Sequence, residues 1–74
     1  MTRIDKCEAG KVYTLSVCDL EKDQENLLYY MGLGVGSQFK ITKTDKHNTI
    51  IQLQNTFTKL GISNKHTSKM YATT

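Results

Sequence analysis

The sequence predicts a mainly β protein: a small barrel of about five short antiparallel strands, with one α-helix inserted after the first strand. Several short segments alternate apolar and polar residues with a period of two, one segment has a helical period instead, and turn residues separate the segments. Short antiparallel strands with tight turns are best satisfied by closing into a barrel, which removes exposed edges. A chain of 74 residues has room for one thin core, so we predict a single domain over residues 1–74.

The first predicted strand covers residues 11–18 and follows Gly10, a residue typical of turns. Within the strand, Tyr13, Leu15 and Val17 lie at alternate positions and are predicted to share one face. The β-branched and aromatic residues of this segment favour a strand over a helix.

The helix is predicted over residues 20–31. Asp19 is the expected N-cap, and acidic residues gather in the segment behind it, where the helix dipole favours negative charge. Gly32 follows the helix directly, as is typical of a helix that ends in a left-handed residue. One apolar stripe at helical spacing is formed by Leu20, Leu27, Leu28 and Met31.

Period two then returns in three further strands, predicted over residues 38–43, 49–54 and 57–62. The polar residues 45–48 are predicted to form the hairpin loop between the first two, and Asn55 to take the left-handed conformation of a tight turn. The residues that share a face within each strand are Phe39 with Ile41, Ile51 with Leu53, and Leu60 with Ile62.

The chain ends in a predicted helical turn over residues 63–67 and a short strand over residues 69–72. In that strand Met70 and Ala72 alternate with more polar neighbours. One helix with five short strands does not fit a layered α/β fold, which needs a helix for each pair of parallel strands. A small barrel remains.

Charge and composition exclude several classes of protein. The net charge is +3, the basic residues are scattered, and one of them is an arginine, whereas readers of specific DNA sequences rely on arginine contacts to guanine. The chain starts at Met1 without a signal peptide, and it has no apolar run long enough to span a membrane. We therefore expect a cytoplasmic protein without direct membrane insertion, in which Cys7 and Cys18 are reduced.

The run Met31-Gly32-Leu33-Gly34-Val35-Gly36 is similar to a phosphate-binding glycine loop. However, these glycines follow a predicted helix and precede a strand, whereas dinucleotide-binding glycines follow a strand and open a helix. The lysine and hydroxyl residue of a P-loop are also missing. We expect a helix cap and a connector, and no bound cofactor.

Neither metal binding nor catalysis is indicated. Structural zinc sites pair close cysteines or histidines, whereas here the two cysteines and the two histidines lie far apart in the sequence. The candidate metal ligands are Cys7, Cys18, His47 and His66, together with Asp45. A metal shared between subunits stays open. No nucleophile elbow, oxyanion hole or carboxylate pair is recognisable, so no catalytic residue and no enzymatic activity is predicted.

Two kinds of binding remain. Tyr13 and Phe39 share faces with aliphatic residues, which is the pattern of a core, so Tyr71 and Phe57 are left for stacking on bases. Binding of single-stranded nucleic acid is therefore an alternative function, although nucleic acid is not the expected partner.

The second kind is protein docking. Tyr29, Tyr30, Leu33 and Val35 gather at the end of the helix and in the glycine connector. An exposed apolar and aromatic cluster of this kind is typical of a docking surface. Another interpretation is that these residues close one end of the barrel. We predict that all four bind a partner.

The order of elements and the glycine run resemble the FeoA family over residues 3–73. The family's apolar, apolar and glycine positions ahead of the first strand are matched by Ile4, Cys7 and Gly10. Its aliphatic-Gly-Leu helix end and following Pro-Gly turn are matched by Met31-Gly32-Leu33 and Val35-Gly36. Its last segment is matched by Leu60, Ile62, Thr67, Met70 and Ala72. Three positions depart from the usual residues: Ala9 and Val35, where proline is common, and Thr67, where alanine is.

The resemblance implies an SH3-like barrel in the cytoplasm, in which Cys7 fills an apolar core position. It also implies a non-enzymatic accessory protein of ferrous iron uptake. The implied partner is FeoB, a membrane transporter whose cytosolic part is a GTPase. A second alternative to this function is an iron chaperone that binds the metal itself through His47 or His66. The oligomeric state stays open.

Overall fold

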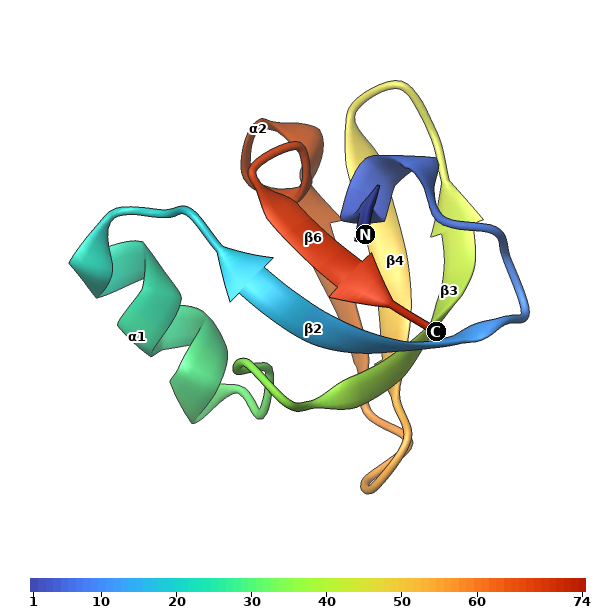
Figure 1. Cartoon of the computed structure of the whole chain (residues 1–74), viewed down its shortest axis with the longest axis horizontal. Coiled ribbons are helices and arrows are strands. Elements are labelled where there is room, and N and C mark those ends of the chain that lie inside the picture. Colours follow the sequence, from blue (N-terminus) through green and yellow to red (C-terminus); the bar gives the residue numbers. More distant parts are fainter.

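The computed structural model describes residues 1–74. Six strands form one antiparallel sheet in the order β1-β6-β2-β3-β4-β5, and the sheet curls around a single core (Figure 1). The predicted mainly β fold with one inserted helix is confirmed. In chain order the elements are β1 (Thr2–Arg3), the 3₁₀ helix η1 (Ile4–Lys6), β2 (Val12–Cys18), α1 (Lys22–Tyr30), β3 (Gln38–Thr44), β4 (Asn48–Leu53), β5 (Lys59–Ser63), α2 (Asn64–Thr67) and β6 (Met70–Thr73).

The barrel closes by packing, because its two edge strands, β1 and β5, are not neighbours in the sheet. Helix η1 follows β1, α2 follows β5, and the two short helices contact each other. The two short helices cover the gap between β1 and β5, which are not joined by hydrogen bonds. Strand β1 was not among the five predicted strands, because a segment of two residues is too short to show an alternation of apolar and polar residues.

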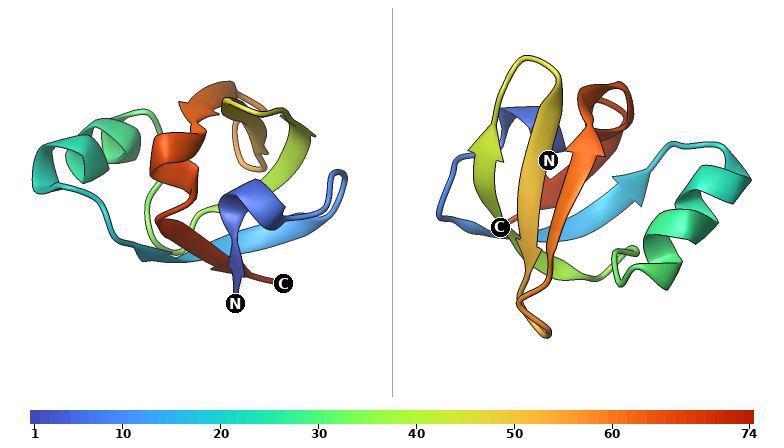
Figure 2. Two further views of the ribbon diagram at one scale, coloured as in Figure 1. Left: turned by 90° about the horizontal axis from the view of Figure 1, so that it is seen from above. Right: turned by 180° about the vertical axis from the view of Figure 1, so that it is seen from behind.

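Both chain ends lie at the same edge of the sheet. Strand β1 pairs with β6 so that Thr2 lies opposite Ala72 and Arg3 opposite Tyr71. The ends therefore lie close together, as Figure 2 shows from two further sides. None of the helices is long and apolar enough to cross a membrane.

The core contains thirteen buried apolar side chains. Phe39 is fully buried, and its ring stacks on that of Tyr13 with centroids 6.2 Å apart. The inward residues predicted for β3 and β4 are confirmed, and in β5 Ile62 is buried whereas Leu60 packs at the margin of the core. The full set is Ile4, Cys7, Tyr13, Leu15, Leu28, Leu33, Phe39, Ile41, Ile51, Leu53, Ile62, Met70 and Ala72.

Strand β2 departs from the predicted alternation at its end. Tyr13 and Leu15 point into the core as predicted, but the pairing with β6 shifts between Leu15 and Val17. Such a bulge inserts one residue and reverses the faces of those that follow. Val17 therefore lies at the surface, and Cys18 packs against the core instead.

Helix α1 begins later than predicted. Its N-cap is Glu21, whose side chain makes no capping hydrogen bond, and its first helical residue is Lys22. Asp19 is therefore not the N-cap. Leu20 lies in the linker before the helix, where it packs against the core margin.

The turn between β4 and β5 also differs from the prediction. The left-handed residue is Phe57, with φ of 59°, and not Asn55. Its backbone N–H donates to the Leu53 carbonyl at 2.9 Å, so Phe57 belongs to the turn and β5 begins at Lys59.

The β3–β4 hairpin loop forms where it was predicted. The Asp45 Oδ1 accepts hydrogen bonds from the backbone N–H groups of His47 and Asn48, both at 2.8 Å. These bonds, that from Asn48 first, hold the pKa of the exposed Asp45 carboxyl below its usual value. The acidic residue thus fixes the loop by local capping.

Asn64, at the start of α2, ties this loop to the core. Its Oδ1 accepts hydrogen bonds from the hydroxyls of Thr49 at 2.7 Å and Thr67 at 2.9 Å, and its Nδ2 donates to the Asp45 carbonyl at 2.9 Å. Both threonine side chains are fully buried. Asn64 therefore satisfies two hydroxyls that water does not reach.

Substituting Asn64→Ala is expected to lower the free energy of unfolding by roughly 2–4 kcal/mol, because two buried hydroxyls lose their acceptor. Urea denaturation followed by circular dichroism measures the change. Asn26→Ala, which removes an exposed amide from α1, is the control, and its effect is expected to stay within about 0.5 kcal/mol. Equal stability of the two variants would contradict the role assigned to Asn64.

Candidate docking surface

Helix α1 stands to one side of the barrel (Figures 1 and 2). Of its nine residues, one is buried: Leu28. The predicted apolar stripe therefore does not cover the core as a whole. Leu27, at 60% exposure, and Met31 point to solvent.

The structure at the end of α1 explains how the helix is attached to the core through Leu28 alone. Gly32 has φ of 102°, its N–H donates to the Tyr29 carbonyl at 2.9 Å, and the Leu33 N–H donates to the Leu28 carbonyl at 2.9 Å. This pair of bonds is the Schellman motif, in which the residue after the glycine packs against the third residue from the helix end. The motif turns Leu33 back toward Leu28, and both side chains are buried.

The position of Leu33 corrects the predicted docking set. The side chain is 2% exposed and belongs to the core, so it cannot touch a partner. The other three predicted residues, Tyr29, Tyr30 and Val35, are all exposed, and Tyr30 is the most exposed at 86%. Leu33 instead packs in the core, beneath the exposed residues of this surface.

Leu27 and Met31, which the predicted apolar stripe assigned to the core, belong to the exposed surface instead. Leu27, Tyr30 and Met31 stand at positions i, i+3 and i+4, which share one helix face. The Schellman signature could have revealed this arrangement, because it assigns the inward positions to Leu28 and Leu33. From here on, the docking surface means Leu27, Tyr29, Tyr30, Met31 and Val35.

The connector from α1 to β3 is held in place by hydrogen bonds. The Ser37 hydroxyl accepts from the Gly34 N–H at 3.0 Å and donates to the Gly32 carbonyl at 3.2 Å. The Gly36 N–H donates to the Leu15 carbonyl at 2.8 Å, which joins the connector to β2. Val35 is thus presented on a fixed backbone.

The backbone of Gly34 supports the ring of Tyr29, one residue of the candidate docking surface. A Cβ at Gly34 would lie 2.7 Å from Cδ1 of Tyr29, closer than real side chains approach. The Tyr29 ring therefore rests on the backbone of Gly34. Because this ring is mostly exposed, it can swing away.

The variant Gly34→Ala is expected to displace the Tyr29 ring with a loss of unfolding free energy below about 1 kcal/mol. Two-dimensional NMR would show shifted ring resonances of Tyr29, and thermal denaturation would show the stability. Val35→Ala, which removes exposed atoms from the next position, is the matched control and should leave the ring in place. An unmoved Tyr29 ring in Gly34→Ala would contradict the assigned contact.

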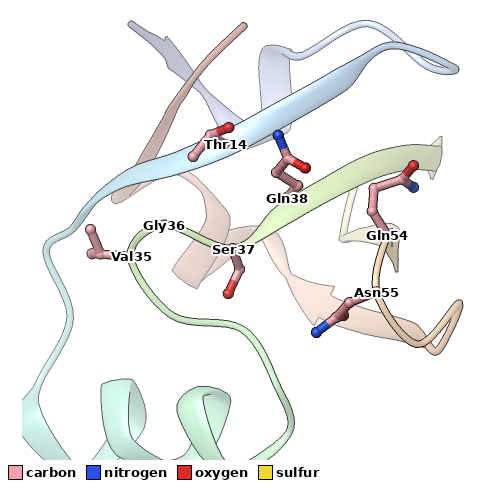
Figure 3. Close-up of a pocket in the computed structure, with 7 residues that line it drawn as sticks. All are labelled: Thr14, Val35, Gly36, Ser37, Gln38, Gln54 and Asn55. Carbon is pink, nitrogen blue, oxygen red and sulfur yellow. The ribbon is translucent and has the colours of Figure 1, made fainter.

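A shallow groove of about 620 Å³ lies beside the connector (Figure 3). It runs between the connector, the adjoining parts of β2 and β3, and the turn after β4. Val35 is its one hydrophobic lining residue and also belongs to the docking surface. The lining residues are Thr14, Val35, Gly36, Ser37, Gln38, Gln54 and Asn55.

Solved structures with the same architecture are known. A crystal structure described as the iron uptake regulatory protein FeoA matches this chain with a TM-score of 0.82 at 12% sequence identity, over 96% of this chain and 93% of that one. This chain has the FeoA fold. The solution structure of FeoA from Chlorobium tepidum matches with a TM-score of 0.81 at 15% identity, over 96% of this chain and 68% of that one. No protein-family model and no curated protein matches the sequence.

In this FeoA-fold chain the two thiols are free. Cys7 is buried, as the resemblance implied, and its Sγ lies 3.4 Å from the Arg3 carbonyl oxygen. Burial raises the pKa of both Cys7 and Cys18, the latter with a further contribution from Glu25. A thiol of raised pKa stays protonated at neutral pH and is therefore a poor nucleophile.

The loop that carries His47 contacts the helix that carries His66, but no group of metal ligands forms there. The His47 carbonyl accepts from the Asn64 N–H at 2.8 Å, which brings the hairpin loop beside α2, where His66 lies. No group of three His, Cys, Asp or Glu side chains is close enough to hold a metal ion.

The two aromatic candidates for base stacking are not brought together. Phe57 is exposed in the turn after β4, whereas Tyr71 lies half-buried on β6, which β2 and β3 separate from β4. A stacking platform needs aromatic rings in succession along one groove. Phe57 and Tyr71 do not form such a platform in this fold.

Proposed function

We propose that this chain is a non-enzymatic cytoplasmic regulator of ferrous iron uptake that docks on the GTPase-containing cytosolic part of a FeoB-type transporter. The observation that carries the proposal is the docking surface, an apolar and aromatic cluster on a helix that stands off a FeoA-fold barrel. The fold supports the choice of partner by analogy.

The composition of the surface supports a protein partner. Tyrosine and methionine are enriched at interface cores, and an exposed aromatic residue commonly anchors binding. Charged residues of α1, such as Lys22, Asp23 and Glu25, lie in its first turns and leave the last turn free for apolar contacts. The helix therefore offers an apolar centre with a charged rim on one side.

Docking is sufficient for regulation. A protein that binds one state of the transporter more tightly than another shifts the balance between the states by that difference in affinity. Such an effect needs no reacting group on the regulator, only a surface that distinguishes the two states.

Isothermal titration calorimetry of this chain with the purified cytosolic part of the transporter encoded in the same organism tests the proposal. We expect saturable binding with one site per chain, together with a changed rate of GTP hydrolysis. Absence of binding up to about 1 mM, an affinity weaker than that of most transient complexes, would refute it.

A further inference from the structure

The side-chain amides of the groove have no partners within the protein. Gln38, Gln54 and Asn55 line it, and none of their side chains takes part in an intramolecular hydrogen bond. Figure 3 shows these three side chains standing around the groove, from β3 and from the turn after β4. Each amide can both donate and accept hydrogen bonds.

The backbone beneath these amides is fixed. The Gln54 N–H donates to the Gln38 carbonyl at 3.0 Å, and the Leu15 N–H donates to the Ser37 carbonyl at 3.0 Å. The backbone of Gln38 and Gln54 is therefore in place before a ligand arrives, and binding has to order only the side chains.

The lining contains no charged residue. A phosphate, carboxylate or metal ligand would find no counter-charge here, and a small apolar molecule would find Val35 alone. Amides without charge are instead complementary to a ligand that itself alternates uncharged donors and acceptors. The main chain of an extended polypeptide is such a ligand.

The groove is continuous with the docking surface. Val35 belongs to both, because it lines the groove and stays exposed beside the end of α1. A protein that covers Tyr29 and Val35 therefore reaches the mouth of the groove. One partner can occupy both sites at once.

We infer that the groove binds an extended polypeptide segment of the docking partner, whose main chain hydrogen-bonds to Gln38, Gln54 and Asn55. The inference rests on the proposed function and specifies the second half of its interface. Val35 marks the boundary between the apolar and the amide-lined halves.

Overlapping synthetic peptides that span the transporter's cytosolic part are the probes. We expect one peptide to shift the amide resonances of Ser37, Gln38 and Asn55 in the ¹⁵N-labelled chain. The double variant Gln54→Ala, Asn55→Ala should weaken that peptide and the intact cytosolic part by about tenfold or more, at roughly fivefold per lost hydrogen bond.

The control is Asn48→Ala, which removes an exposed amide from the opposite end of β4 and should leave binding unchanged. If the intact cytosolic part binds the double variant normally while Tyr30→Asp weakens it, the docking surface stands and the groove inference is overturned. Resonance shifts in the groove on dilution of the chain alone would identify a second copy as the occupant and would also overturn it. If neither the peptides nor the intact part binds, the proposed function itself has failed.

Discussion

Leu33→Asp is expected to unfold the protein at physiological temperature. The substitution places a carboxylate where the side chain is 2% exposed, within the core cluster that contains Leu28. An unpaired buried charge costs about 4 kcal/mol or more, a large part of the total stability of a small domain. In a domain of this size, that loss corresponds to a fall in melting temperature of about 15–30 °C.

Differential scanning calorimetry measures this effect, with Val35→Asp as the matched control. Val35 is two positions further along the same connector and is exposed, so its variant is expected to melt within a few degrees of the parent, about what a surface change of 0.5 kcal/mol produces. If both variants melt alike, Leu33 is not the core residue described here.

Tyr30→Asp is expected to weaken binding to the transporter's cytosolic part by about thirtyfold, the effect of losing one interface anchor worth about 2 kcal/mol. Tyr30 is 86% exposed, so the variant should fold as the parent does. Calorimetric titration against the same partner gives the ratio of affinities.

Phe57→Asp is the matched control for this prediction, because Phe57 is an exposed aromatic residue that belongs neither to the docking surface nor to the lining of the groove. Its left-handed backbone also suits aspartate better than phenylalanine. Binding that depends equally on Tyr30 and Phe57 would argue against a surface centred on α1.

The strands and their buried faces could be predicted from the sequence because each follows one simple period. Phe39 and Ile41 on β3, and Ile51 and Leu53 on β4, are buried at every second position. Where the pairing shifts, as between Leu15 and Val17, the period in the sequence does not change, so the reversal of faces cannot be read from it.

Two local conformations escaped prediction because the residues concerned do not favour them. Left-handed backbone is usual for Asn or Gly and uncommon for a bulky aromatic residue, yet Phe57 adopts it. Strand β1 exists because β6 offers it a partner, and two residues carry no signal of their own.

The candidate site was predicted in part. Its location at the end of the helix and in the connector followed from the composition, and Tyr29, Tyr30 and Val35 are exposed there. Leu33 and Leu27 exchanged places between core and surface because a short helix held by its C-terminal cap buries fewer residues than an amphipathic stripe predicts. The amides of the groove come from separate segments, and only the fold brings them together.

The pairing of Thr2 with Ala72 determines how this small barrel can be joined to other proteins. A unit whose two ends emerge side by side can be spliced into a surface loop of a host protein, or strung in tandem with copies of itself, with little distortion of either. Helix α1, which carries Tyr30, stands apart from the paired ends, so a spliced unit would leave the surface around Tyr30 exposed.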